Sequence, residues 1–162
     1  MTFRTITRAD WPHIRHILQA IVASEEALSL PHDAPEQAWQ DYLFGDETYE
    51  VWGLEEDGEI LGCYHLHPNQ GGLGSHIANG GYVVSPDARG KGIGRRLGEH
   101  SIMRAKELGY RAIQYNFVIS TNVIAVNLWK SLGFEIIGTI PKGYHRKQSD
   151  YVDAYIMFKD FR

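Results

Sequence analysis

The chain has 162 residues, 43% of them hydrophobic and 12% aromatic, which suits one globular domain with a single core. Its net charge is −4, and no Lys or Arg lies between Arg15 and Arg89, which argues against a nucleic-acid binder because such proteins present a basic face. No apolar run approaches the roughly 20 residues that span a bilayer, the first residues do not resemble a signal peptide, and the lone Cys63 excludes an internal disulfide and a cysteine-based zinc site. We therefore expect a cytoplasmic protein with neither a membrane nor a nucleic-acid partner.

Hydrophobic periodicity and turn residues predict one series of strands and helices. The tetrapeptide Glu56-Asp57-Gly58-Glu59 is typical of a hairpin turn, and the mid-strand pair Gly80-Gly81 indicates a β-bulge or the close approach of a ligand or another backbone. The expected elements, in chain order, are a strand from Phe3 to Thr7, a helix opened by Ala9-Asp10-Trp11-Pro12, a helix from Pro35 to Phe44, strands from Tyr49 to Leu54 and Ile60 to Leu66, a loop from His67 to Ser75, a strand from Ile77 to Ser85, a helix from about Gly92 to Leu108, a strand from Ala112 to Val118, a helix from Asn122 to Leu132, and strands from Phe134 to Ile140 and Val152 to Phe158. This order predicts a single α/β (α+β) domain over residues 1–162, built on one central sheet.

Two of these segments carry more specific expectations. Small residues recur along one face of the helix that starts near Gly92, so this helix should lie close against a sheet; they are Gly94, Gly98, Ser101 and Ala105. The segment Tyr144-His145-Arg146-Lys147 should form a loop between the last two strands, where it could line a substrate entrance.

The most informative segment is the turn from Arg89 to Gly94, which follows a strand and opens a helix. Backbone N–H groups and the positive end of the helix dipole converge at such a turn. The alternating glycines remove Cβ atoms where an anion would touch the main chain, and Lys91, Arg95 and Arg96 add positive charge. The turn is therefore expected to bind an anion such as a phosphate group.

Two common phosphate-binding motifs do not fit this turn. A Walker P-loop needs Ser or Thr after its lysine, and neither follows Lys91. The dinucleotide fingerprint would need glycine where Leu97 stands. A glycine-rich turn with no ligand remains the alternative.

The same residues resemble the GCN5-related N-acetyltransferase (GNAT) family. Its signature Arg/Gln-x-x-Gly-x-Gly/Ala, after a strand that ends in Val-x-Pro, is matched by Arg89, Gly92 and Gly94 and by Val84 and Pro86. A second family element is matched by Asn122-x-x-Ala125-x-x-Leu128-Trp129, which ends in Leu132-Gly133-Phe134. The resemblance covers roughly Tyr49 to Phe158.

The resemblance implies a mixed, mostly antiparallel sheet flanked by about four helices, with a splay between two parallel strands. Acetyl-CoA would lie in that splay as the cosubstrate. Backbone groups of Tyr82, Val83 and Val84 would hold the pantetheine arm and polarise the acetyl carbonyl, and Asn122 would hold the arm from the next helix. The implied cofactor-binding residues are Tyr82, Val83, Val84, Arg89, Gly90, Lys91, Gly92, Ile93, Gly94, Arg95, Asn122 and Trp129.

Trp129 departs from the family pattern. Many members have a tyrosine there that protonates the departing thiolate, and an indole N–H is too weak an acid for this role. Tyrosine-type acid catalysis from this position is therefore excluded. We expect Trp129 to pack in the core, with a role as a wall of the cofactor tunnel as the alternative.

A narrower resemblance points to the fungal N-acetyltransferases that detoxify proline analogues such as azetidine-2-carboxylate. It is carried by Pro68-Asn69, Asn79-x-Gly81, Ala88-Arg89-Gly90-Lys91-Gly92, Asn116, Thr121-Asn122, Trp129 and Val152-Asp153-Ala154. In those enzymes asparagines stand at the positions of Asn79 and Asn116, near the acetyl-transfer centre. These two residues are the catalytic candidates, because amides on adjacent strands could orient a substrate or a tetrahedral intermediate. Alternatively, both amides satisfy backbone groups where the sheet parts.

His65 and His67 are also candidates, because two histidines at this spacing can share one face of a strand. A metal site would need a third ligand that the sequence does not specify, so no metal is expected. Either imidazole could serve as a general base, since histidine titrates near neutrality. A core or solvent-exposed histidine without a catalytic role is the other interpretation.

The leading hypothesis is acetyl transfer from acetyl-CoA to the amine of a small molecule, such as an amino acid or a proline analogue. The amine would attack the thioester directly in a ternary complex. A small substrate would be enclosed by the loop from Pro31 to Pro35 and the loop before Asn79. The alternatives are acetylation of a protein N-terminus or lysine, and an acetyl-CoA sensor without catalysis. A homodimer is compatible with the family.

Overall fold

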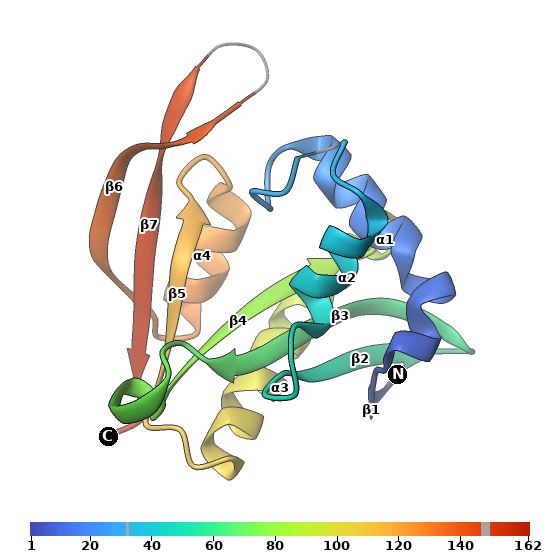
Figure 1. Ribbon diagram of the computed structural model, residues 1–162, viewed down its shortest axis with the longest axis horizontal. Coiled ribbons are helices and arrows are strands. Elements are labelled where there is room, and N and C mark those ends of the chain that lie inside the picture. The colour runs from blue at the N-terminus through green and yellow to red at the C-terminus, as the bar shows by residue number, and fades with distance from the viewer. Residues whose placement is uncertain (32, 147–149) are drawn as a thin grey trace.

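A seven-stranded sheet runs through the molecule, and helices cover both of its faces (Figure 1). The computed structural model describes residues 1–31, 33–146 and 150–162. Its strands are β1 (Thr2–Thr5), β2 (Glu50–Glu56), β3 (Glu59–Pro68), β4 (Ile77–Val84), β5 (Ala112–Ile119), β6 (Glu135–His145) and β7 (Tyr151–Asp160). The α-helices are α1 (Trp11–Ser24), α2 (Glu36–Phe44), α3 (Ile93–Glu107) and α4 (Val123–Ser131), and single 3₁₀ turns occur at Arg8–Asp10, Gly72–Gly74 and Pro86–Ala88. The predicted order of strands and helices is confirmed.

The strand order in the sheet is β1-β2-β3-β4-β5-β7-β6, and every neighbouring pair is antiparallel except β4 and β5. This arrangement confirms the predicted mixed, mostly antiparallel fold. The parallel pairing is short, because only Ile77 and Ala78 of β4 pair with β5. Beyond Ala78, β4 stays paired with β3, and β5 stays paired with β7 apart from a register shift between Tyr115 and Val118. We call the separation of residues 79–84 from residues 114–119 the fork.

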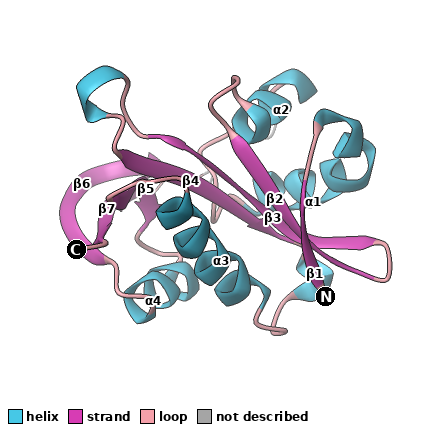
Figure 2. Ribbon diagram, turned by 90° about the horizontal axis from the view of Figure 1, so that it is seen from below, coloured by secondary structure: helices cyan, strands magenta, loops and turns pink. Residues whose placement is uncertain are grey.

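Helices α1 and α2 lie on one face of the sheet, and α3 and α4 lie on the other (Figure 2). In α1, apolar residues recur at helical spacing and are buried, as the sequence predicts; they are Ile14, Ile17, Leu18 and Ile21. They form one core with Cys63 and Val83 of the sheet. The opposite core joins α3 and α4 to the other side of the same strands. Successive residues of β4 therefore pack into different cores, so both faces of this strand are covered beside the fork.

Small residues on α3 make room for α4 as well as for the sheet. A Cβ on Gly98 would lie 2.6 Å from Leu132 and 2.9 Å from Trp129, both contributed by the α4 region. The predicted close approach to the sheet is made further along α3, where the Ser101 hydroxyl lies 2.7 Å from that of Tyr82 on β4.

Three local expectations are corrected by the structure. His67 belongs to β3 rather than to a loop, because the pairing with β4 continues to Pro68. Tyr144 and His145 belong to β6, which keeps pairing with β7 through two register shifts; Lys147 lies outside the described residues. The pair Gly80-Gly81 forms no bulge, since β3 and β4 pair without a register shift. No helix in the described ranges combines the length and apolar character that a membrane span requires.

Candidate active site

The backbone of the turn between β4 and α3 is not covered by side chains of its own glycines. Gly90 and Gly92 have φ values of 77° and 72°, in the left-handed region that favours glycine, and a Cβ built on either would meet nothing within 4 Å. Gly92 is the N-cap of α3, and no side chain of the described residues caps the start of this helix. The N–H groups of the first turn of α3 are therefore available to an external anion, and the binding of one at this turn stays a prediction.

The cationic side chains around this turn differ in whether they already have a hydrogen-bond or ion-pair partner. Among the residues described, Arg89 and Lys91 make no ion pair or side-chain hydrogen bond, and both are exposed. Arg95 donates to the Ser131 hydroxyl of α4 at 2.7 Å, so it also ties α3 to α4. The Ile93 side chain is buried in the core, so only its backbone can face a ligand. Arg89 and Lys91 are thus the best placed to pair with a bound phosphate.

One edge of β4 is open along the fork, because its pairing with β5 ends at Ala78. Tyr82, Val83 and Val84 lie in this open stretch. Val83 is buried on the α1 side and Tyr82 packs on the α3 side, so neither side chain fills the open edge. Backbone N–H and C=O groups on such an edge are free to pair with an extended chain that carries amides, which is the chemistry of a pantetheine arm. The residues present therefore fit acetyl-CoA.

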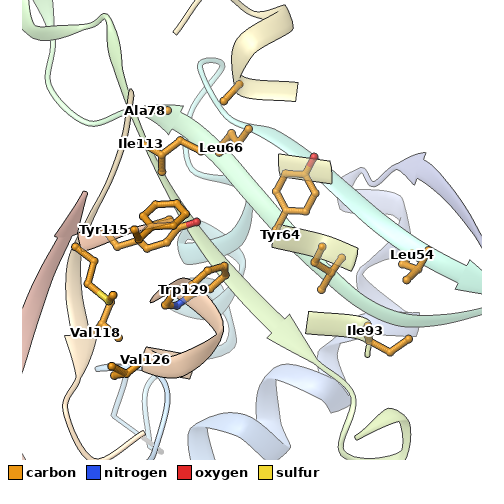
Figure 3. Packing of buried hydrophobic residues seen from close by; sticks show 14 of the residues in the cluster. Leu54, Tyr64, Leu66, Ala78, Ile93, Ile113, Tyr115, Val118, Val126 and Trp129 are labelled. Atoms are coloured by element: carbon orange, nitrogen blue, oxygen red, sulfur yellow. The ribbon is translucent and has the colours of Figure 1, made fainter. Parts of the chain in front are cut away.

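On the α3 face, aromatic side chains bridge the two arms of the fork, and Figure 3 shows two of them, Tyr115 and Trp129, lying side by side. The Tyr82 hydroxyl of β4 lies 2.7 Å from the Tyr115 hydroxyl of β5 and 2.7 Å from that of Ser101. Burial raises the pKa of Tyr82 to about 12, so this hydroxyl stays protonated. Trp129 packs on both rings, with centroid distances of 4.6 Å to Tyr82 and 4.8 Å to Tyr115. Trp129 thus has the expected packing role, and its role as a tunnel wall stays a prediction.

The opposite face of the fork carries amides. Asn116 donates through Nδ2 to Oδ1 of Asn69 at 2.7 Å, and its own Oδ1 accepts from Nε2 of Gln114 at 2.9 Å. Asn79 accepts the backbone N–H of Gly80 at 2.8 Å. The alternative in which both amides bond to backbone groups therefore holds for Asn79. It does not hold for Asn116, whose two hydrogen bonds are to side chains. No hydrogen bond joins Asn79 to Asn116 in the described part of the chain.

Sequence reasoning missed the role of Asn69, which follows β3 and reaches across to Asn116 on β5. Strand pairing that brings these distant segments together is not visible in a local pattern. The motif Pro68-Asn69 was a signal that pointed to this residue, although it did not identify its partner.

Asn122 caps α4, since its side-chain oxygen accepts the Ala125 N–H at 3.1 Å. Within the described residues its amide NH₂ group makes no hydrogen bond, so the cap and the predicted contact with pantetheine are compatible.

His65 is buried beneath the same face, at 4% exposure, and neither ring nitrogen has a hydrogen-bond partner in the described structure. Burial lowers its pKa to about 3. The missing side chain of Gly81 leaves room for its ring, because a Cβ there would lie 2.5 Å from His65 Nε2 and 2.1 Å from the Tyr42 hydroxyl of α2. The predicted close approach of another backbone occurs at Gly80, where a Cβ would lie 2.6 Å from the His65 carbonyl oxygen, whereas side chains rather than a backbone approach Gly81. Within the described ranges, no three His, Cys, Asp or Glu side chains are grouped to hold a metal ion.

Tyr144 of β6 connects the last hairpin to the segment that follows α1. Its hydroxyl donates to the backbone carbonyl of Glu25 at 3.0 Å, and its ring meets that of Phe117 edge to face. The segment that follows α1 is thereby tied to the β5–β7 side of the fork. The enclosing loop predicted from Pro31 to Pro35 includes residue 32, which lies outside the described residues.

Comparisons with known proteins identify the family of this chain. The family model "Acetyltransferase (GNAT) family" matches residues 11–134. The N-acetyltransferase aca1 of Schizosaccharomyces pombe is 41% identical over 98 residues, which are 60% of this chain and 47% of that protein, so this chain spans about half its length. The L-amino acid N-acetyltransferase AaaT of Escherichia coli is 28% identical over 91% of this chain and 90% of its own.

A solved GCN5-related N-acetyltransferase from Kribbella flavida superposes with a TM-score of 0.91 at 33% identity, over 99% of this chain and 97% of its own. The S. pombe relative agrees with the predicted resemblance to fungal N-acetyltransferases. The predicted enzyme class, an acyltransferase, and the predicted cosubstrate, acetyl-CoA, are those of the matched family. This chain belongs to the GNAT family of acetyltransferases.

Proposed function

We propose that this chain transfers the acetyl group of acetyl-CoA to the amine of a small amino acid or amino-acid analogue. The observation that carries the proposal is the amide chain at the fork, in which Asn116 is held between Gln114 and Asn69. One N–H of the Asn116 amide donates to Asn69, and within the described residues the other N–H remains available to donate to a bound molecule. It would meet that molecule on the face opposite the Tyr82–Tyr115 bridge.

The cosubstrate supplies an activated acetyl group as a thioester. The turn from Arg89 to Arg95 and the open edge of β4 are the parts of this chain that would hold it. A free backbone N–H on that edge would donate to the acetyl carbonyl oxygen as negative charge develops there. The chain would contribute chiefly by placing the amine against the carbonyl carbon, which is worth several kcal/mol in such reactions.

Charge on the acceptor side favours an amine. The chain from α1 to β4 contains no Lys or Arg after Arg15, so α2, β2, β3 and β4 carry no cationic side chain. A substrate ammonium group is therefore not repelled there, and the carboxylates of this region attract it. An amino-acid carboxylate would be recognised by neutral donors, such as the free N–H of Asn116, rather than by a cation.

Enclosure favours a small acceptor over a peptide. The Tyr144 bond to Glu25 ties the segment after α1 to the last hairpin, on the face where Asn116 lies. An acceptor that is part of a folded protein would need an open groove on this face. The printed name of the E. coli relative, an L-amino acid N-acetyltransferase, supports the same class of acceptor.

The test is release of free coenzyme A, detected with a thiol reagent, at saturating acetyl-CoA. The panel pairs azetidine-2-carboxylate and common L-amino acids with polyamines, aminoglycosides and short peptides. Preference for free amino acids, and for the cyclic imino acid in particular, is the expected result. Faster turnover of peptides would replace the small acceptor by a protein N-terminus or lysine, and acetyl-CoA binding without turnover of any amine would identify a sensor.

A further inference from the structure

His67 lies next to the point where the sheet divides. It pairs across β3 and β4 with Asn79, the first residue of β4 beyond the parallel pairing. Directly paired residues of antiparallel strands project from the same face, so His67 and Asn79 share the face that carries the amides. His67 is half-buried, which leaves part of its ring accessible.

The tautomer of His67 is set by its own strand. Its Nδ1 lies 2.9 Å from the carbonyl oxygen of Pro68. A carbonyl oxygen only accepts, so Nδ1 carries the hydrogen and Nε2 carries the lone pair. In the described part of the chain, no hydrogen bond to Nε2 is present. The basic nitrogen is thus left free while the other nitrogen holds the ring in place.

The surroundings of His67 fix its orientation and its charge. Its ring stacks on Tyr49, with centroids 4.1 Å apart and planes 3° from parallel, and the His65 ring lies 5.4 Å away. Burial lowers the pKa of His67 from the usual 6.5, against the opposing effects of the Pro68 carbonyl and the Asp46 carboxylate. His67 is therefore neutral at pH 7 and ready to accept a proton.

His65 does not compete for this role. Both of its nitrogens are sealed from solvent, and its ring packs against Tyr42 and Tyr49. A charged imidazolium in that position would have neither water nor a counter-ion around it. The sequence does not distinguish the two histidines as candidate bases, but their different burial does.

We propose that Nε2 of His67 is the general base that accepts the proton from the acceptor nitrogen, a role that rests on the proposed function. The substrate ammonium group first loses one proton to solvent, and the lone pair thus freed forms the C–N bond to the acetyl carbon, while the C–S bond breaks with its electron pair leaving on the sulfur of coenzyme A. The nitrogen becomes acidic once the C–N bond forms, and its proton passes to Nε2. The imidazolium then returns the proton to solvent, and the thiolate is protonated from solvent.

The decisive variant is His67→Asn. An asparagine NH₂ group can replace Nδ1–H as the donor to the Pro68 carbonyl, but it provides no base. His100→Asn is the matched control, because His100 is likewise half-buried and its Nδ1 lies 2.7 Å from a hydrogen-bond partner, the Tyr64 hydroxyl, but its ring stacks on Phe3 of the edge strand β1, away from the fork. We expect kcat of His67→Asn at pH 7 to fall about a hundredfold or more, within the range known for general bases, while acetyl-CoA affinity is unchanged and His100→Asn keeps the kcat of the unaltered protein.

The pH profile provides a second readout. In the unaltered protein, kcat should rise with pH through a pKa below 6.5 and then level off, and this rise should be missing in His67→Asn. Added imidazole should restore part of the lost rate. A His67→Asn variant with unaltered kcat and the same rise overturns the proposal.

A measurement on the unaltered protein covers the case in which the variant does not fold. Heteronuclear NMR of the histidine side chains should show His67 with its hydrogen on Nδ1 at pH 7, and the opposite tautomer overturns the proposal. If the unaltered protein acetylates no amine but binds acetyl-CoA, the proposed function fails. If it acetylates amines and His67→Asn does so equally well, only the role of His67 fails.

Discussion

Gly92 and Gly109 lie at the two ends of α3. Substituting each in turn separates the effect of backbone strain on stability from the effect of a new side chain on ligand binding. Both have positive φ, 72° and 84°, and a Cβ on either would meet no atom within 4 Å. An alanine at either position costs roughly 1–2 kcal/mol of stability, because L-residues disfavour the left-handed conformation. In the free protein, Gly92→Ala and Gly109→Ala should therefore have similar free energies of unfolding, both below that of the unaltered chain.

The two variants should differ sharply in acetyl-CoA binding. At Gly92 the new Cβ occupies the space through which a pyrophosphate would approach the first N–H groups of α3, whereas Gly109 lies at the far end of the helix. A hydrogen bond to a charged group contributes about 1.5–3 kcal/mol, so losing one such contact should raise the Kd about tenfold to a hundredfold. A bulkier residue at Gly92 should abolish binding.

Isothermal titration with acetyl-CoA, together with urea unfolding of each variant, measures both effects. Gly109→Ala should bind acetyl-CoA with the affinity of the unaltered chain despite its lower stability. Equal Kd values for Gly92→Ala and Gly109→Ala would show that the turn does not hold the cosubstrate, and the assignment of residues 89–95 would be withdrawn.

Three further predictions concern the fork. Tyr82→Phe should lower the free energy of unfolding by about 1–3 kcal/mol in urea titrations, because it removes the buried hydroxyl that hydrogen-bonds to both Tyr115 and Ser101; an unchanged value would contradict the bridge. Asn79→Ala and Asn116→Ala should each lower kcat with little change in acetyl-CoA affinity, and normal turnover by both variants would remove the amides from the site. The folded chain binds no proton at His65 until about pH 3, whereas the unfolded chain binds one below 6.5. From pH 7 to pH 5 the unaltered chain should therefore lose roughly 2 kcal/mol more stability than His65→Leu, and parallel urea curves would refute this.

Local patterns in the sequence predicted most of the fold. The hairpin between β2 and β3 was predicted from Asp57-Gly58, and both residues adopt the positive φ that such a turn needs. The start of α3 was predicted from its glycines, and the family and its cosubstrate from the residues around them. These features depend on neighbours in the chain, so a single sequence displays them.

Features that depend on distant partners were predicted less well. The sequence predicts a strand that ends at Ile140, yet β6 continues to His145 because β7 pairs with it on both sides of an irregularity. Likewise, His67 appeared to lie in a loop because Pro68 and Asn69 follow it, whereas pairing with β4 extends the strand. The link from Asn69 to Asn116 and the bridge from Tyr82 to Tyr115 arise only when β4 and β5 lie side by side.

The brevity of the parallel pairing has a mechanical consequence. The sheet has two parts, β1 to β4 and the group β5, β7 and β6, and in the described residues two pairs join their strands, Ile77 with Ala112 and Ala78 with Ile113, beside one backbone hydrogen bond from Arg111 to His76. A molecule bound along the open edges of β4 and β5 would add contacts that hold the two parts of the sheet together. Amide hydrogen exchange should therefore slow along β4 and β5 when acetyl-CoA binds, and the melting temperature should rise with its concentration. Release of coenzyme A would then require these contacts to break and the two parts of the sheet to move apart. If this motion is slower than acetyl transfer, its rate limits kcat.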